Sequence, residues 1–553
     1  RTVNAGDAMT PRQVLDLCHR LLELARKAGA DQAEAAASWR RDAETHVENG
    51  AVHTVQSGEE TTWGLRVLVG NQQGFVTAND LEDGLLAERA AEAVAQARAN
   101  PADPFVGLPA PLPVEAVAGL HDPAIEAVGS AETTALAARM VERVRAMDPR
   151  VRIDNGSVSA VVGTHALAST AGIQVSERSS LVDASLFGMA VDGNEVASFD
   201  YDNAPSRLWS GFEGEVDACC RRFVDKCLTG LGAGTGESFR GPVVLSPEAV
   251  VEFLLPTLVG AMCADAVRKG RSPLASKSHG QVASRLFTLW EDGRLPGGPT
   301  SSAFDREGLP VQRRRLVDAG VLQGFLYNHY EARAAGGNAA STGNAAGGVG
   351  SLPGVGPHRL EVDAGSVALD ALVASGEKAV WVGRYSGSTN PVTGDFSGVA
   401  KNGFLLEHGS RRPVREVLIS GNVFEFLRHH RFNATSPFAR VGPNGKRADD
   451  GLKRNQFGGT LGGPIVHDKL FFFGASQGTI RRQLPATNIM FIPTAQMLAG
   501  DFTAFTSAAC NAGRAINLGA PFVGNRIDPA RFSPAALNIV KRLPTTTSPC
   551  GEI

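Results

Sequence analysis

The sequence is poor in cysteine, and none of its seven cysteines forms a Cys-x-x-Cys pair. Without such a pair, the sequence gives no support for a zinc ribbon or a redox-active dithiol. Five of them are expected to be buried thiols of a reducing compartment: Cys18, Cys219, Cys220, Cys227 and Cys263. The chain also lacks any apolar run near the roughly 18 residues that a membrane-spanning helix needs. No basic and apolar leader opens it, so nothing predicts export of its first part.

Positive charge is scarce in one part of the chain and abundant in another. The net charge of the 553 residues is −3, which argues against a nucleic-acid-binding protein. Residues 423–553 hold 15 Lys and Arg against 7 Asp and Glu, whereas residues 1–422 hold 39 and 50. The last 131 residues also hold 13 of the 26 Phe but none of the 5 Trp or 4 Tyr. This change near Asn422 predicts two parts of different origin, each with its own function.

The N-terminal part combines helical and strand patterns. Apolar residues recur at helical spacing after Thr10, a typical N-cap, and stop at Gly29. Residues 44–78 alternate like short strands, and Asn49-Gly50 is a typical hairpin turn. The further elements are predicted in the order helix 87–99, proline-rich linker 101–113, helix 130–147 and strands 151–200.

A second domain is predicted after a flexible glycine-rich boundary at residues 231–236. Its first helix begins at Ser246, because proline follows at the first helical position. Residues 315–327 and 378–422 are mostly of strand type. Between them, residues 336–356 are rich in glycine but lack the Gly-Lys-Ser/Thr of a phosphate-binding loop. This segment is either a mobile surface loop or a loop that binds a peptide backbone.

Several stretches of residues 9–422 resemble the TldD/PmbA family of metalloproteases, and they occur in the family's order. They are GADQAEA at 29–35, NPADPFVGLP at 100–109, PVVLSPEAV at 242–250, FDREG at 304–308, VDAGVLQGFLYNHYEAR at 317–333, STGNA at 341–345, PGVGP at 353–357, NPVTGDFS at 390–397 and PVREVLISGN at 413–422. The resemblance implies an α+β fold with an N-terminal α/β domain at 9–230 and a β-rich C-terminal domain at 236–422. It also implies a cytoplasmic TldD–TldE heterodimer (TldE is also called PmbA) that degrades unfolded peptides.

The zinc motif of that family is missing. Active TldD subunits carry His-Glu-x-x-x-His on the helix after the PVVLSPEA-like strand, where the imidazoles hold zinc and the carboxylate polarises water. Aligned by its flanks, Pro256 and Ala261 stand at the His positions and Thr257 at the Glu position. None of the 12 His is followed by Glu, so the motif has not moved elsewhere. The resemblance therefore favours a non-catalytic TldE/PmbA-like subunit that binds no cofactor itself and partners a zinc-containing TldD-like chain.

Three polar residues are weak candidates for a substrate channel. Thr342 and Asn344 could bond a peptide backbone, although a turn-forming role suits them equally well. Asp395 follows Gly394 at an expected turn and could line the same path. Two other functions stay open for residues 9–422. They are a self-sufficient peptidase with another site, and a binding protein that modulates DNA gyrase.

The tail resembles a different family, the TonB-dependent outer-membrane receptors of the Oar-like type. The resemblance lies in residues 421–439, 451–478, 492–502 and 525–544, and implies the first strands and an extracellular loop of a β-barrel. Residues 456–461 and 469–473 are expected to be hairpin arms around Gly462-Gly463-Pro464. Cys510 and Cys550 suit a disulfide in an exported loop, and unpaired thiols suit them as well.

A tail of this length supplies only a few strands of a barrel, and open strand edges are not tolerated in lipid. We therefore expect residues 423–553 to form a partial, poorly ordered barrel fragment without a membrane function of its own. The alternative is an outer-membrane transport receptor. The segment GNVFEFL at 421–427 fits both families, which favours a chimera from sequence assembly or gene rearrangement over a selected fusion.

Overall fold

The computed structural model describes residues 8–236, 239, 241–368, 371–372, 378–407, 409–415, 417–421, 424–429, 453–466, 470–482 and 491–552. The chain divides into two compact units, the first of Arg1–Val423 with Gly463–Lys469 and the second of Phe424–Gly462 with Leu470–Ile553. Within the described ranges, no helix combines the length and the apolar character needed to cross a bilayer.

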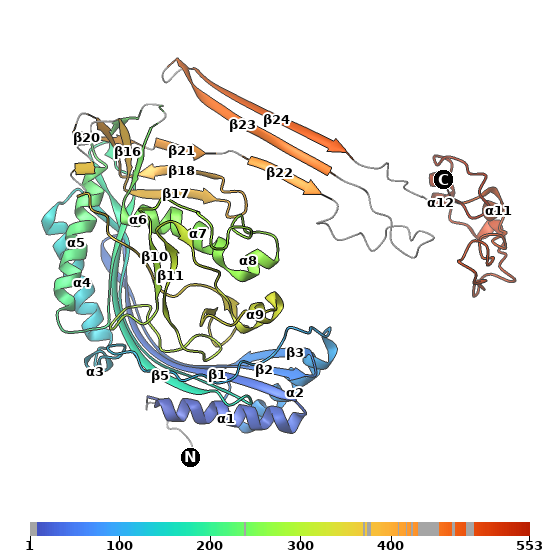
Figure 1. Ribbon diagram of the computed structural model, residues 1–553, viewed down its shortest axis with the longest axis horizontal. Coiled ribbons are helices and arrows are strands. Elements are labelled where there is room, and N and C mark those ends of the chain that lie inside the picture. The colour runs from blue at the N-terminus through green and yellow to red at the C-terminus, as the bar shows by residue number, and fades with distance from the viewer. Residues whose placement is uncertain are drawn as a thin grey trace. The chain divides into compact units, whose positions relative to one another are not determined.

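The first unit begins with a seven-stranded sheet in the order β3-β2-β1-β4-β5-β6, with β7 also beside β5 (Figure 1). Its strands are β1 Gln32–Glu48, β2 Ala51–Val69, β3 Gln72–Ala78, β4 Val151–Ser169, β5 Gln174–Asp192, β6 Glu195–Val196 and β7 Asp200–Ser206. The turn at Asn49-Gly50 is confirmed, and both residues have positive φ, 50° and 70°. The strands themselves are longer than the short runs expected, 17 residues in β1 and 19 in β2.

Helices pack on this sheet and complete one large core. They are α1 Pro11–Ala28, α2 Asp83–Ala99, α3 Pro123–Glu126, α4 Ser130–Met147 and α5 Phe212–Thr229. The caps of α1 are confirmed, since Thr10 accepts from the Gln13 N–H and Gly29 has a φ of 97°. The core buries Trp63 and Phe223 completely. The five cysteines of this unit are free and buried, as expected.

The C-terminal part of the first unit is built from small sheets, a helical segment at residues 247–268 and the helix α9 His329–Ala335. Its strands are β8 Gly234–Thr235, β9 Val243–Leu245, β10 Leu289–Asp292, β11 Arg313–Asp318, β12 Val321–Leu322, β13 Ala345–Ala346, β14 Gly354–Val355, β15 Leu360–Val362, β16 Ala379–Val382, β17 Arg384–Thr389, β18 Phe396–Lys401, β19 Gly403–Glu407, β20 Ser410–Arg415 and β21 Val417–Gly421. The sheets have the orders β12-β11-β10-β15, β13-β14, β8-β20-β19-β16-β9 and β17-β18-β21. The predicted boundary at 231–236 is not simply a flexible linker, because Gly234 and Thr235 pair with Val414 and Arg415.

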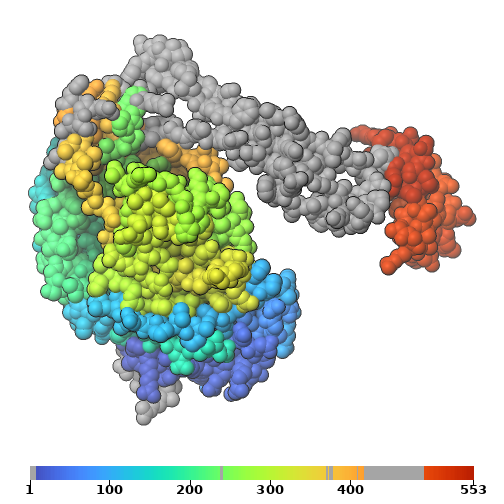
Figure 2. All heavy atoms as spheres, viewed as in Figure 1, coloured from blue at the N-terminus to red at the C-terminus, as the bar shows by residue number. Residues whose placement is uncertain are grey.

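The long strands of the first sheet curve around this C-terminal part (Figure 1). Figure 2 shows its green and yellow residues seated directly on the light-blue residues of the N-terminal part. A buried ion pair joins the two, with Arg306 Nη1 2.8 Å from Glu34 Oε1 of β1. At the same contact Gly308 adopts a φ of 76°, and a Cβ on it would lie only 2.6 Å from Ile173 Cγ2. The close approach therefore requires glycine at this position.

The second unit contains a three-stranded sheet in the order β22-β23-β24, formed by Phe424–His429, Lys453–Val466 and Leu470–Arg482. Residues 456–461 and 470–473 of the two expected hairpin arms lie in the neighbouring strands β23 and β24. The turn expected at Gly462-Gly463-Pro464 is wrong, because β23 runs through these residues to Val466. β22 lies opposite residues 453–458 only. Pro464 lies beyond that pairing, where a residue without an N–H is tolerated in a strand. The Gly-Gly-Pro sequence therefore lies within a strand, and the connection to β24 follows Val466.

Residues 491–552 form an extended, weakly packed segment with short helices at Ala495–Leu498 (α11), Pro529–Arg531 (η3) and Pro534–Val540 (α12). Cys510 and Cys550 are joined by a disulfide, so the pairing alternative holds here. Ile492 and Met497 are the buried apolar side chains among these residues. Low burial of apolar side chains in residues 491–552 fits the expectation of a poorly packed tail.

Candidate functional site

The helix expected to carry a metal motif is interrupted by a wide turn. It consists of α6 Pro247–Ala249, the π-helical turn η1 Val250–Leu254, α7 Leu255–Met262 and, after a break at Cys263, α8 Ala264–Arg268. Pro256 accounts for the wide turn, because it has no N–H for an i→i−4 bond and its ring crowds the carbonyl four residues earlier. The preceding residue, Leu255, accordingly donates its N–H to Val250 O, five residues back.

The three motif positions lie in different surroundings. Pro256 is exposed and Ala261 is buried. The Thr257 hydroxyl lies 3.2 Å from Phe253 O and 2.9 Å from Thr389 Oγ1, so it fastens α7 to β17. A pyrrolidine ring and a methyl group offer no lone pair, and the hydroxyl is already engaged. These residues do not fit a zinc ion. In the part of the chain that the structure describes, no group of three His, Cys, Asp or Glu could hold a metal.

Asp395 lies in the turn that joins β17 to β18. Its backbone carbonyl accepts from the Asn390 N–H at 2.7 Å, and its Oδ2 accepts from Thr393 Oγ1 at 2.7 Å. Gly394 has a φ of 77°, as the expected turn requires. Thr389, which contacts Thr257, is the last residue of β17 before this turn. The structure thus brings the Asp395 turn to the N-terminal side of α7. Its part in a substrate path stays a prediction.

Thr342 and Asn344 lie near the other end of α7. The Leu326 N–H bonds to Met262 O at 2.9 Å, and the next residue, Tyr327, donates its N–H to Thr342 Oγ1 at 2.8 Å. Asn344 is fully buried and donates to a Glu291 carboxylate oxygen and to Gly356 O. These bonds show that the segment around them is not simply a mobile surface loop. They give both residues a structural role, and lining of a peptide channel stays a prediction.

One charged residue of this helical segment, Glu252, was not singled out from the sequence. Its Oε1 accepts from the Tyr201 hydroxyl of β7 at 2.6 Å, and its Oε2 accepts from the Tyr385 N–H of β17 at 2.7 Å. Burial and the bond to Glu252 raise the pKa of Tyr201 to about 12. The carboxylate therefore joins the wide turn to both domains of the first unit.

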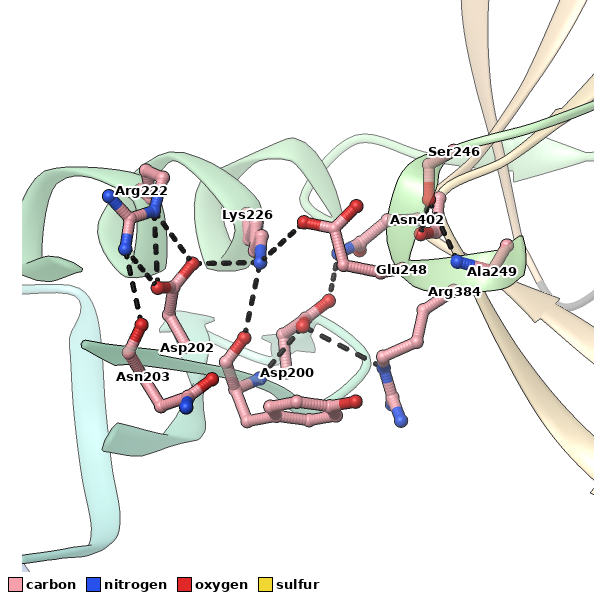
Figure 3. A network of polar contacts seen from close by, with 12 residues as sticks. Asp200, Asp202, Asn203, Arg222, Lys226, Ser246, Glu248, Ala249, Arg384 and Asn402 are labelled. Atoms are coloured by element: carbon pink, nitrogen blue, oxygen red, sulfur yellow. Dashed lines mark hydrogen bonds and ion pairs between the residues drawn. The ribbon is translucent and has the colours of Figure 1, made fainter. Parts of the chain in front are cut away.

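A network of charged side chains extends this contact between α5, β7 and the start of α6 (Figure 3). Asp202 lies 2.7 Å from Arg222 Nη2 and 2.8 Å from Lys226 Nζ, and Lys226 also reaches Glu248 Oε1 at 3.3 Å. Burial would raise the pKa of Asp202, but the bonds from the two cations outweigh it and the pKa is lowered. The carboxylate is thus held ionised, and the network fixes α6 against α5.

A second group of missed residues is the Asp305-Arg306-Glu307 triplet. Both carboxyl groups are buried. Burial raises the pKa of Asp305 to about 6, although the N–H groups of Glu307, Leu309 and Ala345 donate to it. Burial likewise raises the pKa of Glu307 to about 8, which the nearby Arg66 only partly offsets. The one sequence signal was the run of three charges inside FDREG, a marker of the family resemblance.

Family models match most of the chain. The models for domain 1, the central domain and the C-terminal domain of the PmbA/TldA metallopeptidases match residues 33–100, 123–229 and 238–442. Fold and sequence thus define a metallopeptidase-like protein. The chain belongs to the PmbA/TldD family, since the three models together cover more than half of it. A model for an outer-membrane β-barrel domain matches residues 419–551, in line with the different character of the tail.

Individual relatives agree with the family models. An uncharacterized protein of Methanocaldococcus jannaschii is 27% identical over 68% of this chain and 85% of its own length. The metalloprotease PmbA of Escherichia coli O157:H7 is 26% identical over 74% of this chain and 88% of its own length. The crystal structure of TldE from Thermococcus kodakarensis superposes with a TM-score of 0.68 at 21% identity, over 73% of this chain and 91% of that one. This last likeness shows the fold.

Proposed function

We propose that residues 9–422 form a non-catalytic TldE/PmbA-like subunit of a cytoplasmic metalloprotease that acts on unfolded peptides. The observation that carries the proposal is the chemistry at the motif positions. Pro256 and Ala261 have no ligand atom in their side chains, and the Thr257 hydroxyl is engaged with β17. The subunit therefore contributes structure, and the hydrolytic step belongs to another chain.

The proposed partner is a TldD-like chain that carries His-Glu-x-x-x-His and the zinc. Zinc bound by such a motif would lower the pKa of a water molecule and polarise the peptide carbonyl. The proposal is supported by the family membership and by the similarity of this chain to a metalloprotease named PmbA. No nucleic acid or membrane is proposed as a partner of residues 9–422.

The decisive experiment measures zinc and peptide hydrolysis for the full chain, alone and with a co-expressed TldD-like chain. Alone, the protein should contain far less than one zinc per chain and should not cleave an unfolded peptide. With the partner, hydrolysis should appear and should be lost when the partner's motif Glu is replaced by Gln. Stoichiometric zinc with chelator-sensitive cleavage by this chain alone would favour the self-sufficient peptidase instead.

The tail is proposed to take no part in this function and to originate from a separate outer-membrane-type protein. The proposal is supported by the barrel-domain match at residues 419–551 and by the reversal of charge near Asn422. A natural fusion would be recognised by a single transcript that spans residue 422 in the source organism. Two transcripts that each end near this position would support a chimera.

A further inference from the structure

A groove of about 830 Å³ lies on the N-terminal part of the first unit, away from α7. One wall is formed by the first residues of β5, 174–178, and the other by the irregular segment 111–120. Gln174 and Ser176 are exposed in this wall. The volume is within the range of ligand-binding clefts.

The β5 wall of the groove is an unpaired strand edge. Residues 174–190 pair with β4 on one side, but β7 covers only residues 182–188 on the other. The direction of the free groups follows from Ser180, whose N–H bonds to Leu120 O at 2.9 Å and whose carbonyl accepts from Arg207 Nη1 at 2.7 Å. Every second residue of a strand directs its backbone N–H and C=O groups to the same edge of that strand. The N–H and C=O groups of Gln174, Ser176 and Arg178 therefore face the groove.

No hydrogen bond to those backbone groups is found among the described residues of the chain. Along the first part of the segment 111–120, Pro109, Pro111 and Pro113 remove every second N–H that an extended chain could donate to the carbonyls of β5. Further along, its carbonyls are turned to the C-terminal part. Glu115 O accepts from Arg294 Nη1 at 3.2 Å, and Ala118 O accepts from the Gly297 N–H at 3.0 Å. The edge thus stays open although a chain segment runs beside it.

We propose that this groove binds an unfolded peptide as an added β-strand on β5. A row of alternating donors and acceptors is the chemistry that recognises an extended backbone of any sequence. The groove is closed by Pro111 over Gly172 at one end and by the Leu120–Ser180 bond at the other. It therefore takes about five residues at roughly 3.4 Å per residue. Leu112, Val114, Val175 and Phe304 line it and favour apolar side chains on the peptide.

The choice of an unfolded peptide as occupant rests on the proposed function. The evidence for an open strand edge is independent of that function. The probe is a fluorescein-labelled peptide, Thr-Val-Thr-Val-Thr-Val with blocked ends, and its binding to the full chain is followed by fluorescence anisotropy. The control probe carries N-methyl groups on its four central amides. Because N-methylation removes the donors without changing the side chains, we expect at least tenfold weaker binding. Equal binding of the two probes would overturn the proposal.

Variants of Ser176 test the same edge from the protein side. Ser176→Pro removes a groove-facing N–H for which no partner is found among the described residues, and proline is tolerated on a strand edge. It should weaken binding of the unmethylated probe at least tenfold, whereas Ser176→Ala should change it less than twofold. If Ser176→Pro fails to fold, residue-resolved amide exchange of the wild-type protein decides. The probe should slow exchange at Gln174, Ser176 and Arg178, whereas Val175 and Glu177 are already protected by β4.

The outcomes separate this inference from the proposed function. Binding at the edge without hydrolysis in the presence of a TldD-like chain would support the groove and contradict the proposed function. Hydrolysis that is unaffected by Ser176→Pro, with no protection of Ser176 by the probe, would support the proposed function and contradict binding in the groove. A change of oligomeric state in Ser176→Pro without any effect on the probe would make the edge an interface between copies of this chain, which also overturns the proposal.

Discussion

The first unit keeps its cysteines as buried thiols, whereas residues 491–552 join theirs into the Cys510–Cys550 disulfide. Burial raises the pKa of Cys18 and Cys227 to about 12, so these thiols are protonated and unreactive at neutral pH. The surrounding core also buries large side chains such as Trp39 and Phe212. In residues 491–552 apolar burial is confined to Ile492 and Met497.

The difference shows two ways to offset the entropy of an ordered chain. The first unit does so through apolar area removed from water. The tail segment has too little of that area, and a cross-link over 40 residues lowers the entropy of its unfolded state instead. Free thiols and disulfides also belong to opposite redox environments. This contrast supports the proposal that the two parts evolved in different proteins.

The largest expected effect follows from breaking the buried ion pair of the first unit. Arg306→Met leaves the Glu34 carboxylate with one cation fewer, and it also removes the donor to Gly348 O. Arg66 remains 2.7 Å from Glu34, so we expect a loss of about 3 kcal/mol, the lower end of the cost of breaking a buried ion pair. The control, Arg89→Met, breaks the exposed pair with Glu92 and should cost less than about 1 kcal/mol. Equal shifts in a denaturant titration of both variants would contradict a buried role for Arg306.

Removal of the Cys510–Cys550 disulfide should destabilise residues 491–552 and leave the first unit unchanged. Replacing Cys510 and Cys550 by Ser frees a loop of 40 residues, which the loop-entropy model values at about 3 to 4 kcal/mol. Amide exchange of residues 491–552 should become fast, while the melting temperature of the first unit stays unchanged. Treatment of the wild-type protein with a reductant serves as the matched control and should reproduce the variant. Retained protection in both cases would mean that packing holds this segment together without the cross-link.

The pH dependence of stability should also differ between the two parts. The folded-state pKa of Glu307 is about 8, above its usual 4.5. The folded state therefore binds more protons than the unfolded state between these values, so the first unit loses stability as pH rises through this window. Glu307 should contribute at most about 1.4 kcal/mol per pH unit to this slope, and Glu307→Gln should flatten it in melts from pH 6 to 8. This range lies above the pKa of about 6 of Asp305, which adds to the slope at lower pH. An unchanged slope in the variant would refute this assignment.

In the tail we expect the opposite pH dependence, with stability that falls as the pH is lowered. Bonds from Thr503 and Arg526 lower the pKa of Asp501, so its contribution is present above the usual pKa and is lost as the pH falls below it. Asp501→Asn should remove this acid sensitivity from the exchange of residues 491–552. Exchange that stays equally sensitive to acid in the variant would point to another group.

Local signals predicted the elements better than they predicted the site. Asn49-Gly50 and the Thr10 cap specify their structures through bonds within a few residues, and both were predicted correctly. The turn assigned to Gly462-Gly463-Pro464 failed because a strand tolerates these residues where its neighbour ends. The Arg306–Glu34 pair joins residues 272 positions apart, a distance over which spacing carries no information. Likewise, the sequence could place Thr257 at a lost motif position but could not reveal its bond to Thr389.

The smallest expected effect is that of removing the tail. Deletion of residues 423–553 should change the melting temperature of the first unit by less than about 2 °C, which corresponds to less than about 1 kcal/mol. The reason is that, among the side chains that the structure describes, the apolar cores of residues 8–417 contain none from residues 491–552. Solubility should rise, because the deletion removes β24 with its three consecutive phenylalanines at 471–473. Calorimetry and light scattering of the full and shortened chains provide the measurement. If the shortened chain unfolds, or if residues 423–553 alone melt cooperatively with slow amide exchange, the two parts are one functional protein and the chimera proposal is wrong.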